Sequence, residues 1–167
     1  MDRNTIENIF NFLKEKEDKE LPKKWFDSIE KFKLIKELET HPDGTQYKHN
    51  GNLNLINTNI TKLPNDLYVE GGLFLMGCSQ LTELPDELYV GGLNLGGLTI
   101  KELPNDLHVT YDLSLYNCKQ ITELPNNLHV GNEFFIRGTP LADKYTNKQI
   151  IDIVTSTGGL IVGKILR

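Results

Sequence analysis

The amino-acid sequence predicts an α/β repeat solenoid, in which about five short coils build a parallel β-sheet between helical ends. Three observations lead to this fold class. A Leu-x-Leu-type element recurs at spacings of 20, 20, 20 and 21 residues, starting at Leu53, Leu73, Leu93, Leu113 and Phe134. Leu-Pro dipeptides recur at spacings of 21, 19 and 21, starting at Leu63, Leu84, Leu103 and Leu124. Within each copy, leucines alternate with other residues, which is the period of a half-buried strand.

Each coil is predicted to turn back on itself after its strand. A further apolar residue follows the Leu-x-Leu element, at Ile60, Leu81, Ile100, Ile121 and Leu141. In the first four copies Leu-Pro comes next, and proline lacks the N–H group that regular strand pairing needs. The chain then returns through Leu-x-Val segments that begin at Leu67, Leu88, Leu107 and Leu128. We expect one strand per coil and leucines that contact those of the neighbouring coils, because no coil buries its apolar edge alone.

This pattern resembles the leucine-rich repeat family, over roughly residues 47–145. The resemblance implies a short right-handed coil whose outward sheet face is the usual contact surface. The Leu-Pro dipeptide, the L-x-V-G-G-L-x-L variant and the segment RGTPLADKY (residues 137–145) resemble short repeats of bacterial and tailed-phage proteins. The family's usual buried asparagine is replaced here, so we do not expect a full asparagine ladder; the replacements are Thr58, Cys78, Leu98, Cys118 and Thr139.

The two ends of the repeat array are predicted to be capped within one compact unit. We expect an N-terminal helical cap at residues 1–46, leucine-rich repeats at 47–142 and a C-terminal cap at 143–167. Residues 4–13 place apolar side chains on one helical face, and a second helix is predicted from Pro22. At the other end, Thr146 to Gln149 matches a capping box, Gly158-Gly159 ends the helix, and residues 160–166 are predicted to form a final strand that closes the sheet edge.

The composition indicates a soluble globular protein. Charged residues make up 25% of the chain and hydrophobic residues 38%, and the net charge is −5. No apolar run reaches the ~20 residues that cross a bilayer, and the first twenty residues lack the apolar core of a secretory signal, so we expect a cytoplasmic protein.

The negative charge is concentrated in the repeats. Residues 42–140 contain five basic and eleven acidic residues, a net charge of −6. This acidity disfavours direct nucleic-acid binding, because phosphate recognition depends on lysine and arginine. It leaves three alternatives: a basic protein partner, an acidic mimic that occupies a nucleic-acid site, or charge that only maintains solubility.

The sequence predicts no enzyme, catalytic residue, metal site or cofactor. It contains no nucleophile-elbow, phosphate-loop, dinucleotide-binding or zinc-protease motif. Glycine pairs recur with the coil, which indicates turns and close stacking. Three glutamates also recur just before Leu-Pro, which marks a repeated structural position and not a catalytic pair; they are Glu83, Glu102 and Glu123.

The cysteines and histidines have structural interpretations. Cys78 and Cys118 lie two coils apart, roughly 10 Å, which is too far for a disulfide, so both are expected as small buried residues. A row of aromatic side chains is expected on the outside of the Leu-x-Val segments, formed by Tyr68, Tyr89, His108 and His129. A stacked surface row is favoured over a metal site or a pH-sensitive contact, because no further ligand motif accompanies the two histidines.

The outward face of the predicted sheet is the candidate protein-binding surface. Aromatic residues, methionine and arginine are enriched at interfaces, and several stand at outward positions of this face. The alternative is that the terminal helices fold over the face and bury these side chains. The candidate residues are Asn54, Phe74, Met76, Asn94, Asp112, Ser114, Tyr116, Glu133, Phe135 and Arg137.

Two functions follow from these expectations. The first is a non-catalytic protein–protein interaction module, and the phage-type resemblance implies a phage or prophage accessory protein that binds and modulates, for example inhibits, a bacterial host protein. The second is a structural component that self-assembles through a solenoid end or an edge strand, which would make the protein a homo-oligomer.

Overall fold

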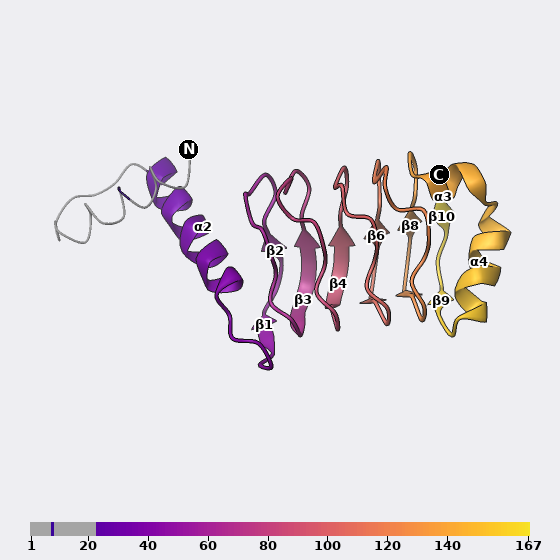
Figure 1. The fold of residues 1–167 in the computed structure, drawn as a ribbon, viewed down its shortest axis with the longest axis horizontal. Coiled ribbons are helices and arrows are strands. Elements are labelled where there is room, and N and C mark those ends of the chain that lie inside the picture. Colours follow the sequence, from indigo (N-terminus) through magenta and orange to yellow (C-terminus); the bar gives the residue numbers. More distant parts are fainter. Residues whose placement is uncertain (1–7, 9–22) are drawn as a thin grey trace. The chain divides into compact units, whose positions relative to one another are not determined.

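The structure is a computed structural model that describes residue 8 and residues 23–167 (Figure 1). Contacts divide the chain into two compact units, Met1–Thr40 and His41–Arg167, and each is described by itself. In the first unit, helix α2 spans Lys23–Glu39, and Phe32, Ile35 and Leu38 are buried among the side chains that the structure describes. The predicted helix at residues 4–13, apart from Asn8, and the predicted helix start at Pro22 lie outside the described residues.

The second unit is a parallel-sheet β-solenoid of about four turns, which confirms the predicted repeat solenoid. Figure 1 shows its strands side by side along the stack. Every pairing between them is parallel. The strands are β1 (Tyr47–His49), β2 (Leu53–Asn54), β3 (Leu67–Phe74), β4 (Tyr89–Asn94), β5 (His108–Val109), β6 (Leu113–Ser114), β7 (His129–Val130), β8 (Phe134–Phe135), β9 (Leu160–Ile161) and β10 (Ile165–Leu166).

The Leu-x-Leu elements stack in register, as the repeat predicts. Leu53 pairs with Leu73, Leu73 with Leu93, Leu93 with Leu113, and Leu113 with Phe134. Ile165 of β10 then adds a further rung beside Phe134. All six of these side chains are buried, so one apolar file runs through the whole stack.

The Leu-x-Val segments form a second ladder of strands, where we expected only one strand per coil. Val69 pairs with Val90, Val90 with Val109, Val109 with Val130, and Val130 with Ile161. In β3 and β4 a single strand runs through both ladders, whereas later coils break the strand between them. The chain therefore bends between the two ladders, and the coils follow one another in the same order in both.

Two left-handed turns in each coil reverse the chain. The first follows the Leu-x-Leu element, and its φ values lie between 55° and 75°; its residues are Asn57, Gly77, Gly97, Asn117 and Gly138. The second precedes the Leu-x-Val segment, with φ between 54° and 58°, at Asp66, Glu87, Asp106 and Asn127. Asparagine, aspartate and glycine tolerate this conformation best, which explains why they recur at these positions.

The C-terminal segment contains two helices and two short strands. Helix α4 (Asn147–Ser156) begins with the predicted capping box of Thr146 and Gln149, and it buries Ile150 and Val154. Figure 1 shows α4 beyond β9 and β10, at the end of the stack. Helix α3 (Pro140–Lys144) was not predicted; Thr139 caps it and Pro140 stands in its first turn. The predicted strand at residues 160–166 is two strands, because β9 joins the Leu-x-Val ladder and β10 joins the Leu-x-Leu ladder.

The bend between the two ladders depends on the close approach of successive coils. A Cβ atom added to Gly91 of β4 would lie 2.5 Å from the carbonyl oxygen of Glu70 and 2.7 Å from that of Gly71. Both obstacles are backbone atoms of the preceding coil, so a rotamer change cannot remove the clash. The next residue, Gly92, has room for a Cβ atom, whose nearest neighbour would be Asp112 O at 3.6 Å.

Gly91→Ala is therefore expected to destabilise the solenoid by about 2 kcal/mol, because one methyl group must force two coils apart. Gly92→Ala is the matched control, and we expect it to change the free energy of unfolding by less than about 0.5 kcal/mol. Urea unfolding of the wild type and both variants measures the difference. Equal stability of the two variants would contradict this account of the bend.

Candidate functional site

The candidate binding surface is the outward side of the Leu-x-Leu ladder. Its central file follows the strand register from Asn54 to Phe74, Asn94, Ser114 and Phe135. All five side chains are exposed or half-buried, while the apolar residues on either side of each are buried. The structure therefore brings these five predicted residues together as one continuous file.

A second file runs beside the central one, where each strand enters its first turn. Met76 is 39% exposed and Tyr116 is 47% exposed, and Arg137 is also exposed. Backbone hydrogen bonds hold the neighbouring turns together, from Asn57 N to Met76 O at 2.8 Å and from Asn117 N to Arg137 O at 2.9 Å. Met76, Tyr116 and Arg137 are thus presented by a fixed backbone.

The third file lies where each Leu-x-Leu strand begins. Asp112 Oδ1 accepts hydrogen bonds from Asn132 Nδ2 at 2.7 Å and from Glu133 N at 3.0 Å. Asn52 makes the corresponding bond in the first coil, where its Oδ1 accepts from Gly72 N at 2.7 Å. These side chains link successive coils, and Asp112 and Glu133 add negative charge to this side of the face.

A groove of about 360 Å³ lies on the candidate face, which is at the small end of the range for ligand sites. Phe74 and Phe135 stand at its two ends, roughly 14 Å apart, because two strands separate theirs. Tyr111, which is 61% exposed, adds a third aromatic side chain. The remaining lining residues are Gly72, Gly92, Leu93, Asn94, Asp112 and Ser114.

A larger recess of about 780 Å³ lies at the Leu-Pro turns, between residues 101 and 126. A recess of about 380 Å³ occupies the equivalent place two coils earlier, lined by residues that include Lys62, Glu83 and Asp86. Because it recurs with the coil and has a mainly polar lining, we attribute this recess to the coil geometry. The groove at Phe74 and Phe135 is formed instead by outward residues that differ from coil to coil, so it is the more specific feature.

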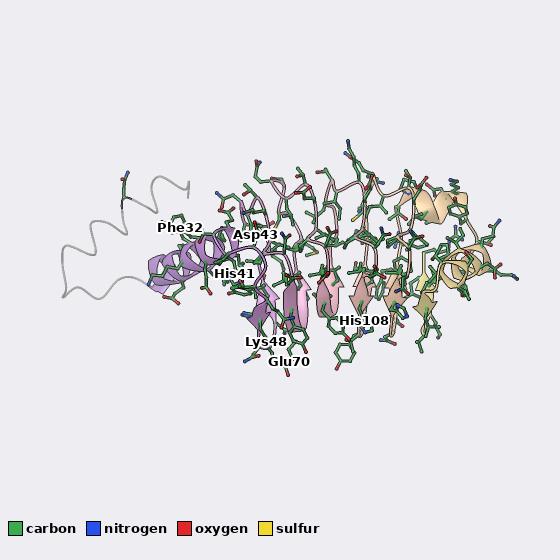
Figure 2. All side chains as sticks on the ribbon, turned by 60° about the horizontal axis from the view of Figure 1, so that its bottom comes forward. Phe32, His41, Asp43, Lys48, Glu70 and His108 are labelled. Carbon is green, nitrogen blue, oxygen red and sulfur yellow. The ribbon has the colours of Figure 1, made fainter. Side chains whose placement is uncertain are left out.

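The predicted aromatic row is present on the outside of the Leu-x-Val ladder. Ring centroids are 5.6 Å apart between Tyr68 and Tyr89, 4.5 Å between Tyr89 and His108, and 5.6 Å between His108 and His129. The rings are nearly parallel, with interplanar angles from 8° to 20°. Lys48 extends the row, with Nζ 5.2 Å from the Tyr68 ring centroid. Figure 2 shows Lys48 and His108 on the same side of the strands.

The stacked row perturbs the titration of its inner histidine. Burial lowers the pKa of the His108 imidazole, and the charge of neighbouring His129 lowers it further. A histidine whose pKa is lowered in the folded state favours folding while it is neutral. That contribution is present above its ordinary pKa of 6.5 and is lost as the pH falls below it.

His108→Tyr is expected to reduce the acid sensitivity of the fold, because tyrosine keeps the ring stacking seen at Tyr68 and Tyr89 but stays neutral below pH 8. The variant should lose less stability than the wild type between pH 7.5 and pH 5. Urea unfolding at both pH values measures this loss. An equal loss in the two proteins would show that the histidine pair does not contribute to the pH dependence.

The second left-handed turns form an acidic edge of the coils. A side-chain hydrogen bond with Asp66 raises the pKa of the Glu87 carboxyl group, and the negative charges of Asp66, Asp86 and Asp106 add to the effect. In the coil after Asp106, the equivalent turn residue is the neutral Asn127. Its Nδ2 donates a hydrogen bond to Asp106 Oδ1 at 2.8 Å, so the like-charge repulsion ends there. Carboxylates in successive coils therefore repel one another along this edge at neutral pH.

Both cysteines are free and buried, as predicted. Cys78 Sγ donates to Leu55 O at 2.9 Å and Cys118 Sγ donates to Leu95 O at 3.1 Å, so each thiol links its coil to the preceding one. Burial raises the pKa of the Cys118 thiol, which keeps it protonated. Both cysteines therefore act as small buried residues that join neighbouring coils.

Metal sites and membrane spans concern the same described part of the chain. Among these residues, no group of three or more His, Cys, Asp or Glu side chains is placed to hold a metal ion. No helix in the same part of the chain has the length and apolar character needed to span a membrane.

The sequence predicted the files of the candidate face but missed Tyr111 and the groove. Tyr111 stands in the connection between Val109 and Leu113, two residues before the Leu-x-Leu element, and so outside the outward positions that the alternation around that element identifies. In comparisons with known proteins, no family model, curated protein or solved structure matches this chain.

Proposed function

We propose that this protein is a non-catalytic protein-binding module that uses the outward face of its Leu-x-Leu ladder. The observation that carries the proposal is the groove between Phe74 and Phe135, bordered by the exposed side chains of Met76 and Tyr116. Polar residues would be sufficient for a solvated sheet face. Aromatic residues and methionine gathered on one surface are instead typical of an interface.

The proposal includes membership of the leucine-rich repeat family. The in-register leucine files, the 20-residue offset between paired leucines and the buried Thr58, Cys78 and Thr139 support this assignment. On this basis the solenoid is a right-handed coil with a helical cap at the N-terminal end and a helix–strand cap at the C-terminal end. Proteins of this family commonly contact their partners through the sheet face.

The partner is proposed to be a basic protein, because residues 42–140 carry a net charge of −6. The phage-type character of the repeats supports a phage or prophage accessory protein that acts in the bacterial cytoplasm and modulates a host protein. A non-catalytic role agrees with the mainly aromatic, glycine and amide lining of the groove, in which Asp112 accepts hydrogen bonds from the next coil.

A pull-down from bacterial lysate tests this function. The triple variant Phe74→Ala/Tyr116→Ala/Phe135→Ala should lose the partner proteins that the wild type retains, because truncating central aromatic residues typically weakens an interface at least tenfold per hot spot. The control variant Tyr89→Ala/Ile151→Ala/Leu160→Ala removes three exposed apolar residues outside the face and should retain them. Identical partner sets for all three proteins would exclude the face as the binding site.

Self-assembly is the second candidate, and the exposed residues at the C-terminal edge favour it. Leu160 is 52% exposed and Val162 is 67% exposed, at the last strand of the Leu-x-Val ladder. However, Asn147 Nδ2 donates to Ile165 O at 2.9 Å, so one outward carbonyl of β10 already has a partner. The edge is thus partly closed to a further strand, and we place this function second.

Light scattering separates the two functions. An interaction module should keep the mass of one chain, 19.0 kDa, as its concentration is raised. A self-assembling component should grow in mass with concentration, and Leu160→Lys/Val162→Lys should suppress that growth by placing like charges at the edge. Growth of the wild type that these substitutions abolish would replace the first function with the second.

A further inference from the structure

The groove on the candidate face carries one negative charge among its apolar walls. Among the described residues that line it, Asp112 is the only one with a charged side chain. Phe74, Tyr111 and Phe135 supply the aromatic surface, and the rest of the lining consists of Leu93 and of glycine and polar residues. A side chain that suits this groove is apolar along its length and positively charged at its end.

The inter-coil backbone bond that Asp112 makes does not require a charged side chain. Its Oδ1 atom accepts the backbone N–H of the residue at the same position in the next coil, Glu133, at 3.0 Å. Asn52 makes the same type of bond with its neutral amide, from Gly72 N to Oδ1 at 2.7 Å. An asparagine oxygen is therefore sufficient to accept the backbone N–H at this position of the coil, and the negative charge of Asp112 adds a property that this bond does not require.

The second carboxylate oxygen of Asp112 is available to a ligand. Both of its hydrogen bonds to Asn132 and Glu133 are made by Oδ1, and Oδ2 makes none within the described part of the chain. Asp112 is half-buried, so an ion pair formed at Oδ2 is less screened by water than one on an open surface.

We propose that this groove binds an arginine side chain of the partner protein, with the guanidinium on Asp112 and the stem along the aromatic walls. This inference rests on the proposed function and gives the chemistry of the residue that the face recognises. Arginine is favoured over lysine because its guanidinium is planar and weakly hydrated, and it stacks on aromatic rings while it pairs with a carboxylate. The net charge of −6 over residues 42–140 attracts such a basic partner.

A titration with three small probes tests the proposal on the full chain. The probes are N-acetyl-arginine amide, N-acetyl-citrulline amide, which has the shape of arginine without its charge, and N-acetyl-lysine amide. Backbone amide shifts in NMR spectra report binding at Asp112, Ser114 and Phe135. We expect the arginine probe to bind about fivefold more tightly than the citrulline and lysine probes, which is the size of one partly screened charge pair combined with stacking.

Two variants separate the charge from the aromatic wall. Asp112→Asn keeps an oxygen for Glu133 N, so it should retain the thermal stability of the wild type and lower arginine binding about fivefold, to the level of citrulline. Phe135→Leu should weaken both arginine and citrulline, because both planar groups stack on the ring, and should weaken arginine more, because only its charge adds a cation–π attraction. Equal binding of arginine and citrulline by the wild type, lysine binding as tight as arginine binding, or no shifts at these residues would each overturn the proposal.

The arginine site and the protein-binding function can fail independently of each other. Partner proteins that depend on Phe74, Tyr116 and Phe135, together with arginine binding no tighter than citrulline binding, would leave the interaction module in place and remove only the arginine site. Arginine binding without any dependence of the partner set on the face would retain the groove as a guanidinium site and exclude the face as the protein interface.

Discussion

The structure of the second unit depends on one constraint, which is that the apolar residues of every coil must stack in register on those of the next coil. Leu53, Leu73, Leu93 and Leu113 form one such file, and the valines of the Leu-x-Val segments form another. Burying each leucine contributes roughly 1.5–3 kcal/mol, but only when a neighbouring coil covers it. Parallel backbone hydrogen bonds hold this register, and the inter-coil bonds of Cys78 and Cys118 add to them.

The same constraint determines what the surface can offer. Since every inward position is occupied by a stacking residue, the positions between them form straight outward files in which side chains from distant parts of the sequence become neighbours. One file presents Phe74 and Phe135 with small residues between them, and another stacks Tyr89 on His108. The stacking of the coils in register therefore produces both the groove and the aromatic row. The two surfaces differ in chemistry because the stacking does not determine which residues occupy the outward positions.

Much of this arrangement could be predicted from the sequence, because the spacing of leucines fixes which residues are equivalent. The central file and the buried cysteines follow from that spacing alone. The Leu-x-Val strands could not be predicted as strands, since two or three residues are too few to show an alternation. Helix α3 was missed because it has only five residues, although Thr139-Pro140 was a start signal. The groove depends on Tyr111, which stands in the connection between the Leu-x-Val and Leu-x-Leu segments, outside the strand alternation from which the face was predicted.

Nuclear Overhauser effects between backbone protons test the central constraint most directly. We expect cross-strand contacts that connect Leu73 with Leu93 and Leu93 with Leu113, and corresponding contacts that connect Val90 with Val109. The offset should stay near twenty residues along the whole array, in the pattern of parallel strands. Contacts confined to hairpins within one repeat, or an antiparallel pattern between repeats, would contradict the stacked register and the binding face that depends on it.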